Sequence, residues 1–138
     1  MEPDESRVKV LALDYGSART GVAVSDPTGT IARPLGVVED VAAQDGFDKL
    51  LEVIRIEQPE TIVVGLPLTL RGEHGEQARE TEHFVAALKS VTPRSVETFD
   101  ERFTTDLAAQ TPARAPEDAR AAAHLLSSYL AWSSGVGA

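Results

Sequence analysis

The chain has 138 residues, contains no cysteine, and carries a formal net charge of −9 from 13 Lys and Arg against 22 Asp and Glu. The length fits one domain, the lack of cysteine excludes disulfides and thiolate metal sites, and the acidic balance argues against coating of nucleic acid by bulk electrostatic attraction. An enzyme acting on phosphodiesters is not excluded, because carboxylates that hold divalent cations add negative charge themselves. The sequence has no apolar run of membrane-spanning length and no signal-peptide pattern, so we expect a cytoplasmic protein that does not enter the membrane.

The first elements of the chain are extended. Residues 8–14 and 20–25 predict two strands of a hairpin, and 30–39 predicts a third strand that Pro34 marks as an edge or interrupted strand, since proline cannot donate to a ladder. The first strand is nearly all apolar, which is typical of a strand buried on both faces. We therefore expect it at the centre of the sheet.

Helices and strands alternate in the rest of the chain. The spacing of apolar residues predicts, in order, helix 45–58, strand 61–66, helix 76–90, strand 95–99, short helix 104–110 and helix 117–132. This order predicts an α/β fold with a mixed five-stranded sheet and helices on both faces, formed by a single domain over 1–138. We expect 1–6 and 133–138 to be flexible.

Asp14 ends the first strand on the same face as Val10 and Ala12. A carboxylate in line with core side chains costs several kcal/mol unless a cation or hydrogen-bond donors meet it. Two interpretations remain open at this point. Asp14 caps the next turn by accepting from the amides of Gly16 and Ser17, or it belongs to a larger acidic site.

Further acids follow at two other positions. Asp100 and Glu101 come directly after strand 95–99, and a parallel strand would end beside Asp14, although alternation does not decide which acid faces inward. Asp118 lies four residues before Ala122, on the apolar face of the last helix. The alternative for Asp100 and Glu101 is a solvated charge cluster at the strand end. The alternative for Asp118 is an acid that only stabilises the helix dipole.

Three convergent carboxylates, Asp14, Glu101 and Asp118, would form an oxygen-ligand site for Mg²⁺ or Mn²⁺. Two such ions can activate water and stabilise the leaving oxygen in phosphodiester hydrolysis. The candidates for binding phosphate are the guanidinium groups of Arg19, Arg71 and Arg102 and the hydroxyl of Thr105. The alternative is that these arginines are ordinary surface residues and that Thr104 only caps a helix. The loop that carries Arg71 is either a flap over the substrate or a plain surface connection.

Four motifs extend this pattern over nearly the whole chain: Leu13-Asp14-Tyr15-Gly16 with Arg19, Gly21 and 22–26; Val63-Val64-Gly65-Leu66-Pro67-Leu68; Asp100-Glu101-Arg102-Phe103-Thr104-Thr105; and Asp118-Ala119 with 121–122, 125–126 and 129–130. In this order they resemble the YqgF/RuvX family of Holliday-junction-resolvase-like and pre-16S rRNA nucleases. The resemblance implies a ribonuclease-H-like fold, divalent metal and cleavage of structured RNA or branched DNA, usually 5′-end processing of 16S rRNA precursor in pre-ribosomal particles. It assigns the family's acids to Asp14, to Glu101 with Asp100 beside it, and to Asp118.

The sequence departs from the family pattern between Thr105 and Asp118. The stretch is shorter than is usual in the family, and Arg114 is its single basic residue. This difference is expected to affect substrate binding more than the catalytic chemistry.

Two other classes of function are weighed against the nuclease. A non-catalytic RNA-binding factor in ribosome assembly would keep the fold without the activity, and the short stretch and the acidic charge favour it slightly. Nucleotide binding of the actin or hexokinase type needs two such lobes, which one domain of this size does not supply. The three histidines, His74, His83 and His124, are interpreted as surface or helix residues, and the pattern leaves open a monomer or a homodimer.

Overall fold

The computed structural model describes residues 9–69, 71–103 and 117–133. The predicted helix 104–110, Thr105 and the predicted flexible residues 1–6 and 134–138 lie outside this part of the chain. The strands are β1 (Val10–Asp14), β2 (Arg19–Ser25), β3 (Ala32–Glu39), β4 (Thr61–Leu66) and β5 (Ser95–Asp100). The α-helices are α1 (Gln44–Glu57), α2 (Glu76–Val91) and α3 (Glu117–Ser133).

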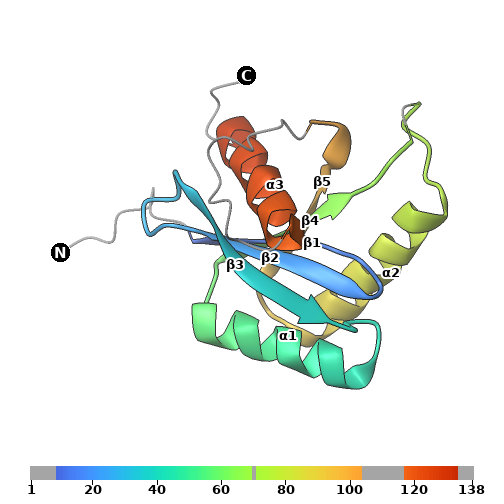
Figure 1. Cartoon of the computed structure of the whole chain (residues 1–138), viewed down its shortest axis with the longest axis horizontal. Helices are drawn as coiled ribbons and strands as arrows, with labels where there is room; N and C mark the ends of the chain where they lie inside the picture. Colours follow the sequence, from blue (N-terminus) through green and yellow to red (C-terminus); the bar gives the residue numbers. More distant parts are fainter. Residues whose placement is uncertain (1–8, 70, 104–116, 134–138) are drawn as a thin grey trace.

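The five strands form one mixed sheet in the order β3-β2-β1-β4-β5 (Figure 1). β1 pairs antiparallel with β2 and parallel with β4, and β4 pairs parallel with β5. The predicted central position of the first strand is confirmed. Because β1, β4 and β5 run in the same direction, their carboxyl ends meet along one edge of the sheet, where Asp14 and Asp100 lie.

β3 is an edge strand, as Pro34 predicted. Its pairing with β2 shifts register between Val22 and Ala23: Val22 lies opposite Gly36, whereas Ala23 lies opposite Pro34. One residue of β3 is therefore left over at the shift. A bulge next to the proline is the local irregularity expected where a strand residue has no N–H to donate.

The helices cover both faces of the sheet, with α1 and α2 on one side and α3 on the other (Figure 1). The core under α1 and α2 is built mainly of leucine, isoleucine, valine and phenylalanine, including Leu11, Leu13, Leu50, Ile62, Phe84 and Leu88. The core under α3 contains many alanines, including Ala12, Ala23, Ala122 and Ala123. Alternation along β1 thus sends Leu11 and Leu13 to one core and Val10 and Ala12 to the other, as a buried central strand requires.

Most element boundaries differ from the prediction by one or two residues, and two of these differences have a clear local cause. The last strand extends through Asp100 and continues into a 3₁₀ turn, η1 (Glu101–Phe103), that apolar spacing does not reveal. α1 ends at Glu57 because Gln58 adopts the left-handed conformation, with φ 50°, and its amide donates to the carbonyl of Ile54. Among the helices described, none is long and apolar enough to cross a membrane.

Candidate active site

Asp14 meets Glu101 at the carboxyl edge of the sheet. Asp14 follows Val10 and Ala12 on the α3 face, and its side chain shares a hydrogen bond with that of Glu101. Two carboxyl groups form such a bond only when one of them carries a proton. The amide of Gly16, which the capping interpretation assigned to Asp14, donates instead to Oγ1 of Thr20, at 3.5 Å.

Gly65 of β4 makes this contact possible. β4 lies between β1 and β5, so the backbones that carry Asp14 and Glu101 are about 10 Å apart across two strand spacings. A Cβ on Gly65 would lie 2.5 Å from Oε1 of Glu101. The missing side chain therefore gives the Glu101 carboxyl room over β4. A glycine inside an apolar strand often marks such a close approach.

Gly21 of β2 has the corresponding role on the other side of Asp14. It lies directly opposite Asp14 in the β1–β2 register, and a Cβ at this position would lie 1.9 Å from the backbone oxygen of Asp118. The first turn of α3 therefore rests against β2 close to Asp14. The Asp118 side chain is 39% exposed and its Oδ2 lies 3.4 Å from Nε of Arg19.

The environment disfavours full ionisation of the pair. Burial raises the pKa of Asp14, the hydrogen bond with Glu101 lowers it, and the charge of Asp118 raises it again. Burial, helped by the charge of Asp14 and the hydrogen bond with it, raises the pKa of Glu101 to about 7. The two groups therefore hold a proton between them up to near-neutral pH, and a cation at this position would relieve the repulsion that full ionisation brings.

Asp100, the other acid at the end of β5, lies in a different environment. Its Oδ2 accepts from Nε of Arg102 at 2.9 Å, and its Oδ1 accepts from the Arg102 amide at 2.9 Å. The hydrogen bond from the Arg102 side chain lowers the pKa of Asp100. The structure thus decides what alternation left open: Glu101 contacts Asp14, and Asp100 pairs with Arg102.

The predicted phosphate-binding residues are spread around the acid pair. Arg19 pairs with Asp118, and Arg102 pairs with Asp100 beside Gly72, where a Cβ would lie 3.3 Å from Nη1 of the arginine. Arg71 is exposed in the loop between β4 and α2. Thr105 lies outside the described residues, so its role stays a prediction.

The donor set fits a hard divalent cation. Asp14 and Glu101 offer carboxylate oxygens, and Mg²⁺ is commonly bound by one or two carboxylates together with water and substrate phosphates. Within residues 9–69, 71–103 and 117–133, no three His, Asp or Glu side chains lie close enough together to hold one ion. The pair fits the ion, and the three-carboxylate set with Asp118 stays a prediction.

His124 lies beside the acid pair, a position that sequence reasoning missed. It lines a hollow of about 240 Å³ together with Asp14, Glu101, Ala121 and Leu125. Its position three residues after Ala121, on the helix that carries Asp118, is the signal that places it on the same side of α3. Sequence analysis interpreted His124 as a surface or helix residue and so did not connect it with the acids.

Solved structures with the same fold include a Holliday junction resolvase. The chain resembles RuvC of Thermus thermophilus, solved in complex with a Holliday junction substrate, with a TM-score of 0.59 and 19% identity over 93% of this chain and 96% of that one. The mixed five-stranded sheet with helices on both faces is thus the ribonuclease-H-like fold of the resolvases, as predicted.

Sequence comparison identifies the family. The family model RuvX, described as Holliday junction resolvase, matches residues 8–132. A candidate pre-16S rRNA nuclease of Sulfurihydrogenibium sp. (strain YO3AOP1) is 47% identical over 105 residues, which cover 75% of this chain and 71% of that protein. Another, of Rubrobacter xylanophilus, is 42% identical over 94% of this chain and 96% of its own. The chain belongs to the RuvX family.

Proposed function

We propose that this protein is a divalent-metal-dependent nuclease that hydrolyses phosphodiester bonds in structured RNA and processes the 5′ end of 16S rRNA precursor. The observation that carries the proposal is the contact between Asp14 and Glu101 at the carboxyl ends of β1 and β5. Gly65 leaves room for the Glu101 side chain in this contact, and Gly21 leaves room for the backbone of Asp118 at the start of α3. The names of the relatives support pre-16S rRNA as the substrate.

Asp14 and Glu101 are the residues proposed to hold Mg²⁺ or Mn²⁺. Asp118 stays the predicted third ligand, although the structure does not bring its side chain within range of the same ion. When bound, such an ion supplies Lewis-acid polarisation of a phosphate oxygen and positive charge for the transition state. The protein's part is to hold the carboxyl groups in a partly buried, low-dielectric position, so that little reorganisation is needed when the substrate enters. Because the pKa of Glu101 is raised to about 7, the proton that the pair holds near neutral pH would be released if a cation bound to both carboxylates.

The arginines are proposed to bind the phosphates that flank the scissile bond. Arg19 and Arg102 each contact an acid of the site region, Asp118 and Asp100, and these contacts orient their guanidinium groups. Planar guanidinium groups bind phosphate oxygens in pairs, which fixes the strand relative to the acid pair. Arg71 and Thr105 are proposed to extend this binding along the substrate.

Cleavage of defined substrates tests the proposal. Purified protein is incubated with Mg²⁺ or Mn²⁺ and with three labelled substrates: the 5′ region of 16S precursor, unstructured RNA of the same composition, and a four-way DNA junction. We expect the precursor to be cut fastest, and EDTA to stop the reaction. Faster cutting of the junction would support the resolvase alternative, and no cutting of any substrate would support a non-catalytic assembly factor.

A pair of matched variants assigns the activity to the site. Asp14→Asn removes one carboxylate from the pair, and we expect cleavage to fall roughly a thousandfold or more. Asp48→Asn makes the same change on the exposed surface of α1, where the side chain accepts from Gln44 at 2.7 Å, and cleavage is expected to stay unchanged. Equal activity of the two variants would contradict the assignment.

A further inference from the structure

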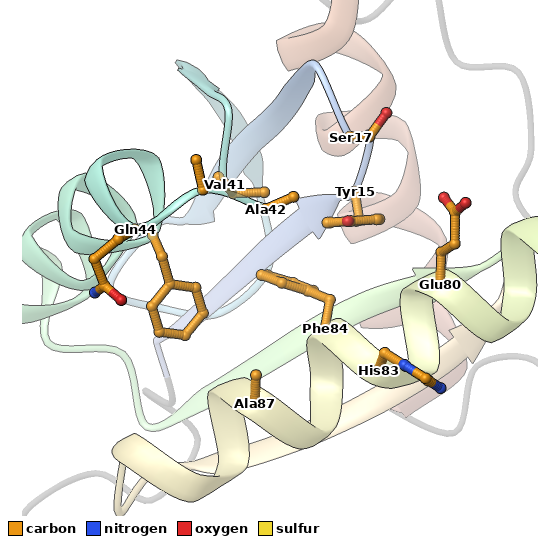
Figure 2. Close-up of a pocket in the computed structure, with 11 residues that line it drawn as sticks. Tyr15, Ser17, Val41, Ala42, Gln44, Glu80, His83, Phe84 and Ala87 are labelled. Atoms are coloured by element: carbon orange, nitrogen blue, oxygen red, sulfur yellow. The ribbon is translucent and has the colours of Figure 1, made fainter.

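A large pocket lies on the α1/α2 side of the sheet, next to the turn that follows Asp14. Its volume is about 580 Å³, within the range of small-molecule sites. Three aromatic side chains line it, Tyr15 after β1, Phe47 from α1 and Phe84 from α2. Figure 2 shows Tyr15 and Phe84 between the segment that carries Val41 and Ala42 and the helix α2.

The pocket adjoins the acid pair. A smaller hollow of about 150 Å³ is lined by both Asp14 and Glu101, and it shares Tyr15, Ser17 and Glu80 with the large pocket. Tyr15 is also the residue directly after Asp14 in the chain. A molecule whose reacting group lies at the acid pair can therefore extend one of its parts past Tyr15 into the large pocket.

The aromatic side chains form one continuous wall, in which Tyr15 and Phe47 are partly exposed and Phe84 lies buried behind them. The rings of Tyr15 and Phe84 are stacked, with centroids 4.6 Å apart and an interplanar angle of 22°. Phe47 meets Phe84 edge-on at 6.3 Å and 86°, which holds the Phe84 ring in this orientation. Nucleobases stack on such platforms at about 1–3 kcal/mol per base, whatever their sequence.

The polar groups of the pocket suit a base and not a phosphate. Its eleven lining residues include no Lys or Arg, but they include a carboxylate from Glu80 and an imidazole from His83. A carboxylate repels phosphate but accepts hydrogen bonds from the exocyclic amines of cytosine, adenine and guanine. Uracil and thymine carry no such amine. Ser17 and Gln44 add further hydrogen-bonding groups at the wall.

We propose that this pocket binds an unpaired nucleobase of the substrate strand, adjacent to the phosphodiester at the acid pair, and prefers a base with an exocyclic amine. The inference rests on the proposed function and deepens it by naming the local form of the substrate. A base enters such a pocket only after it leaves its stack, so the strand next to the cut is single-stranded or bulged.

Binding of short labelled RNAs tests the pocket without relying on catalysis. Fluorescence anisotropy is measured with oligo(A), oligo(C) and oligo(U) of equal length in the presence of Ca²⁺, and a gel confirms that the RNA stays intact. We expect oligo(A) and oligo(C) to bind roughly fivefold more tightly than oligo(U), as one added hydrogen bond would give. Glu80→Gln is expected to reduce this preference.

Two neighbouring alanines on α2 supply the matched variants. Ala87 lines the pocket and Ala86 does not, and both are exposed. Ala87→Trp fills the pocket from its rim and is expected to weaken oligo(A) binding roughly tenfold, whereas Ala86→Trp leaves it unchanged. Gln44→Trp blocks the same pocket from α1 and is expected to match Ala87→Trp if that variant folds poorly.

The outcomes separate this inference from the proposed function. Equal affinity and equal base preference in wild type, Ala87→Trp and Gln44→Trp would overturn the pocket, even if the wild type cuts RNA with Mg²⁺ or Mn²⁺. Loss of affinity in both blocked variants, together with a wild type that cuts no substrate, would support the pocket and overturn the nuclease.

Discussion

The two faces of the sheet are packed in different ways. Under α1 and α2 the core is made almost wholly of large side chains. Under α3, alanines of the sheet and the helix lie among leucines and aromatic residues, and glycines occupy the strand positions beside Asp14. Large interdigitating side chains contribute most of the hydrophobic free energy but keep backbones apart. Small ones let a helix approach a sheet closely. The comparison suggests that one face chiefly stabilises the domain and the other chiefly brings backbone and acids together.

The largest effect on stability is expected from the face with large side chains. Leu50 of α1 is fully buried, and Leu50→Ala should lower the free energy of unfolding by about 3–4 kcal/mol through lost burial and a cavity. Cleavage measured well below the melting temperature should stay within roughly twofold of wild type. Leu126→Ala, at an equally buried position of α3, should cost similar stability but also reduce cleavage. Equal activity of the two variants would contradict the division between the faces.

A smaller loss of stability is expected at Gly21, where α3 lies close to β2. A Cβ at Gly21 would lie 1.9 Å from a backbone oxygen that cannot rotate away, so Gly21→Ala must displace α3. We expect a loss of about 2–3 kcal/mol in urea unfolding, with cleavage reduced to background. Gly36→Ala on neighbouring β3 is the control, because nothing lies within 4 Å of its Cβ position. A Gly21→Ala variant as stable and active as Gly36→Ala would refute the packing argument.

The acid pair predicts a pH dependence of stability in the metal-free protein. The pKa of Glu101 rises from its ordinary 4.5 to about 7 on folding, so between these values the folded state alone keeps the proton. Stability should therefore fall as pH rises from about 4.5 to about 7, by about 1–2 kcal/mol, and change little above that through this group. The charges of Asp14 and Asp100 act in the same direction.

The variant Glu101→Gln isolates the contribution of this carboxyl group to the pH dependence of stability. Urea unfolding at several pH values should show a slope in the wild type over this window that the variant lacks. Identical slopes in the two proteins would mean that Glu101 is not the group that couples folding to proton uptake.

The smallest effect on stability is expected at Gly65. Its added Cβ would meet Oε1 of Glu101 at 2.5 Å, and this is the far end of a flexible side chain that can move aside. Gly65→Ala should therefore change stability by less than about 1 kcal/mol while reducing cleavage roughly tenfold or more, because Glu101 no longer lies over β4. A thermal melt and a cleavage assay on the same sample check both parts. Full activity would show that the glycine is not needed for the site.

Sequence patterns predicted the fold well because the apolar alternation is strong. The all-apolar first strand indicated its central position, and Pro34 indicated an edge strand. Alternation also predicted the face of Asp14. It failed to choose between Asp100 and Glu101, since the strand continues into a 3₁₀ turn whose geometry alternation does not describe.

The aromatic pocket was beyond the reach of sequence reasoning for a different reason. Tyr15, Phe47 and Phe84 come from three separate parts of the chain, and nothing in the sequence around any one of them indicates that they meet. They meet only because α1 and α2 lie on the same face of the sheet, next to the turn after β1. The roles of Gly21 and Gly65 were likewise hidden, because a glycine in a strand indicates a close approach without saying what approaches.

Isothermal titration of Mn²⁺ into the metal-free protein tests most directly whether the Asp14–Glu101 pair is the centre of the chemistry. We expect binding at millimolar Mn²⁺ or below in the wild type and in Asp48→Asn, and loss of binding in both Asp14→Asn and Glu101→Gln. Unchanged binding in the two site variants, or no binding in the wild type, would contradict it.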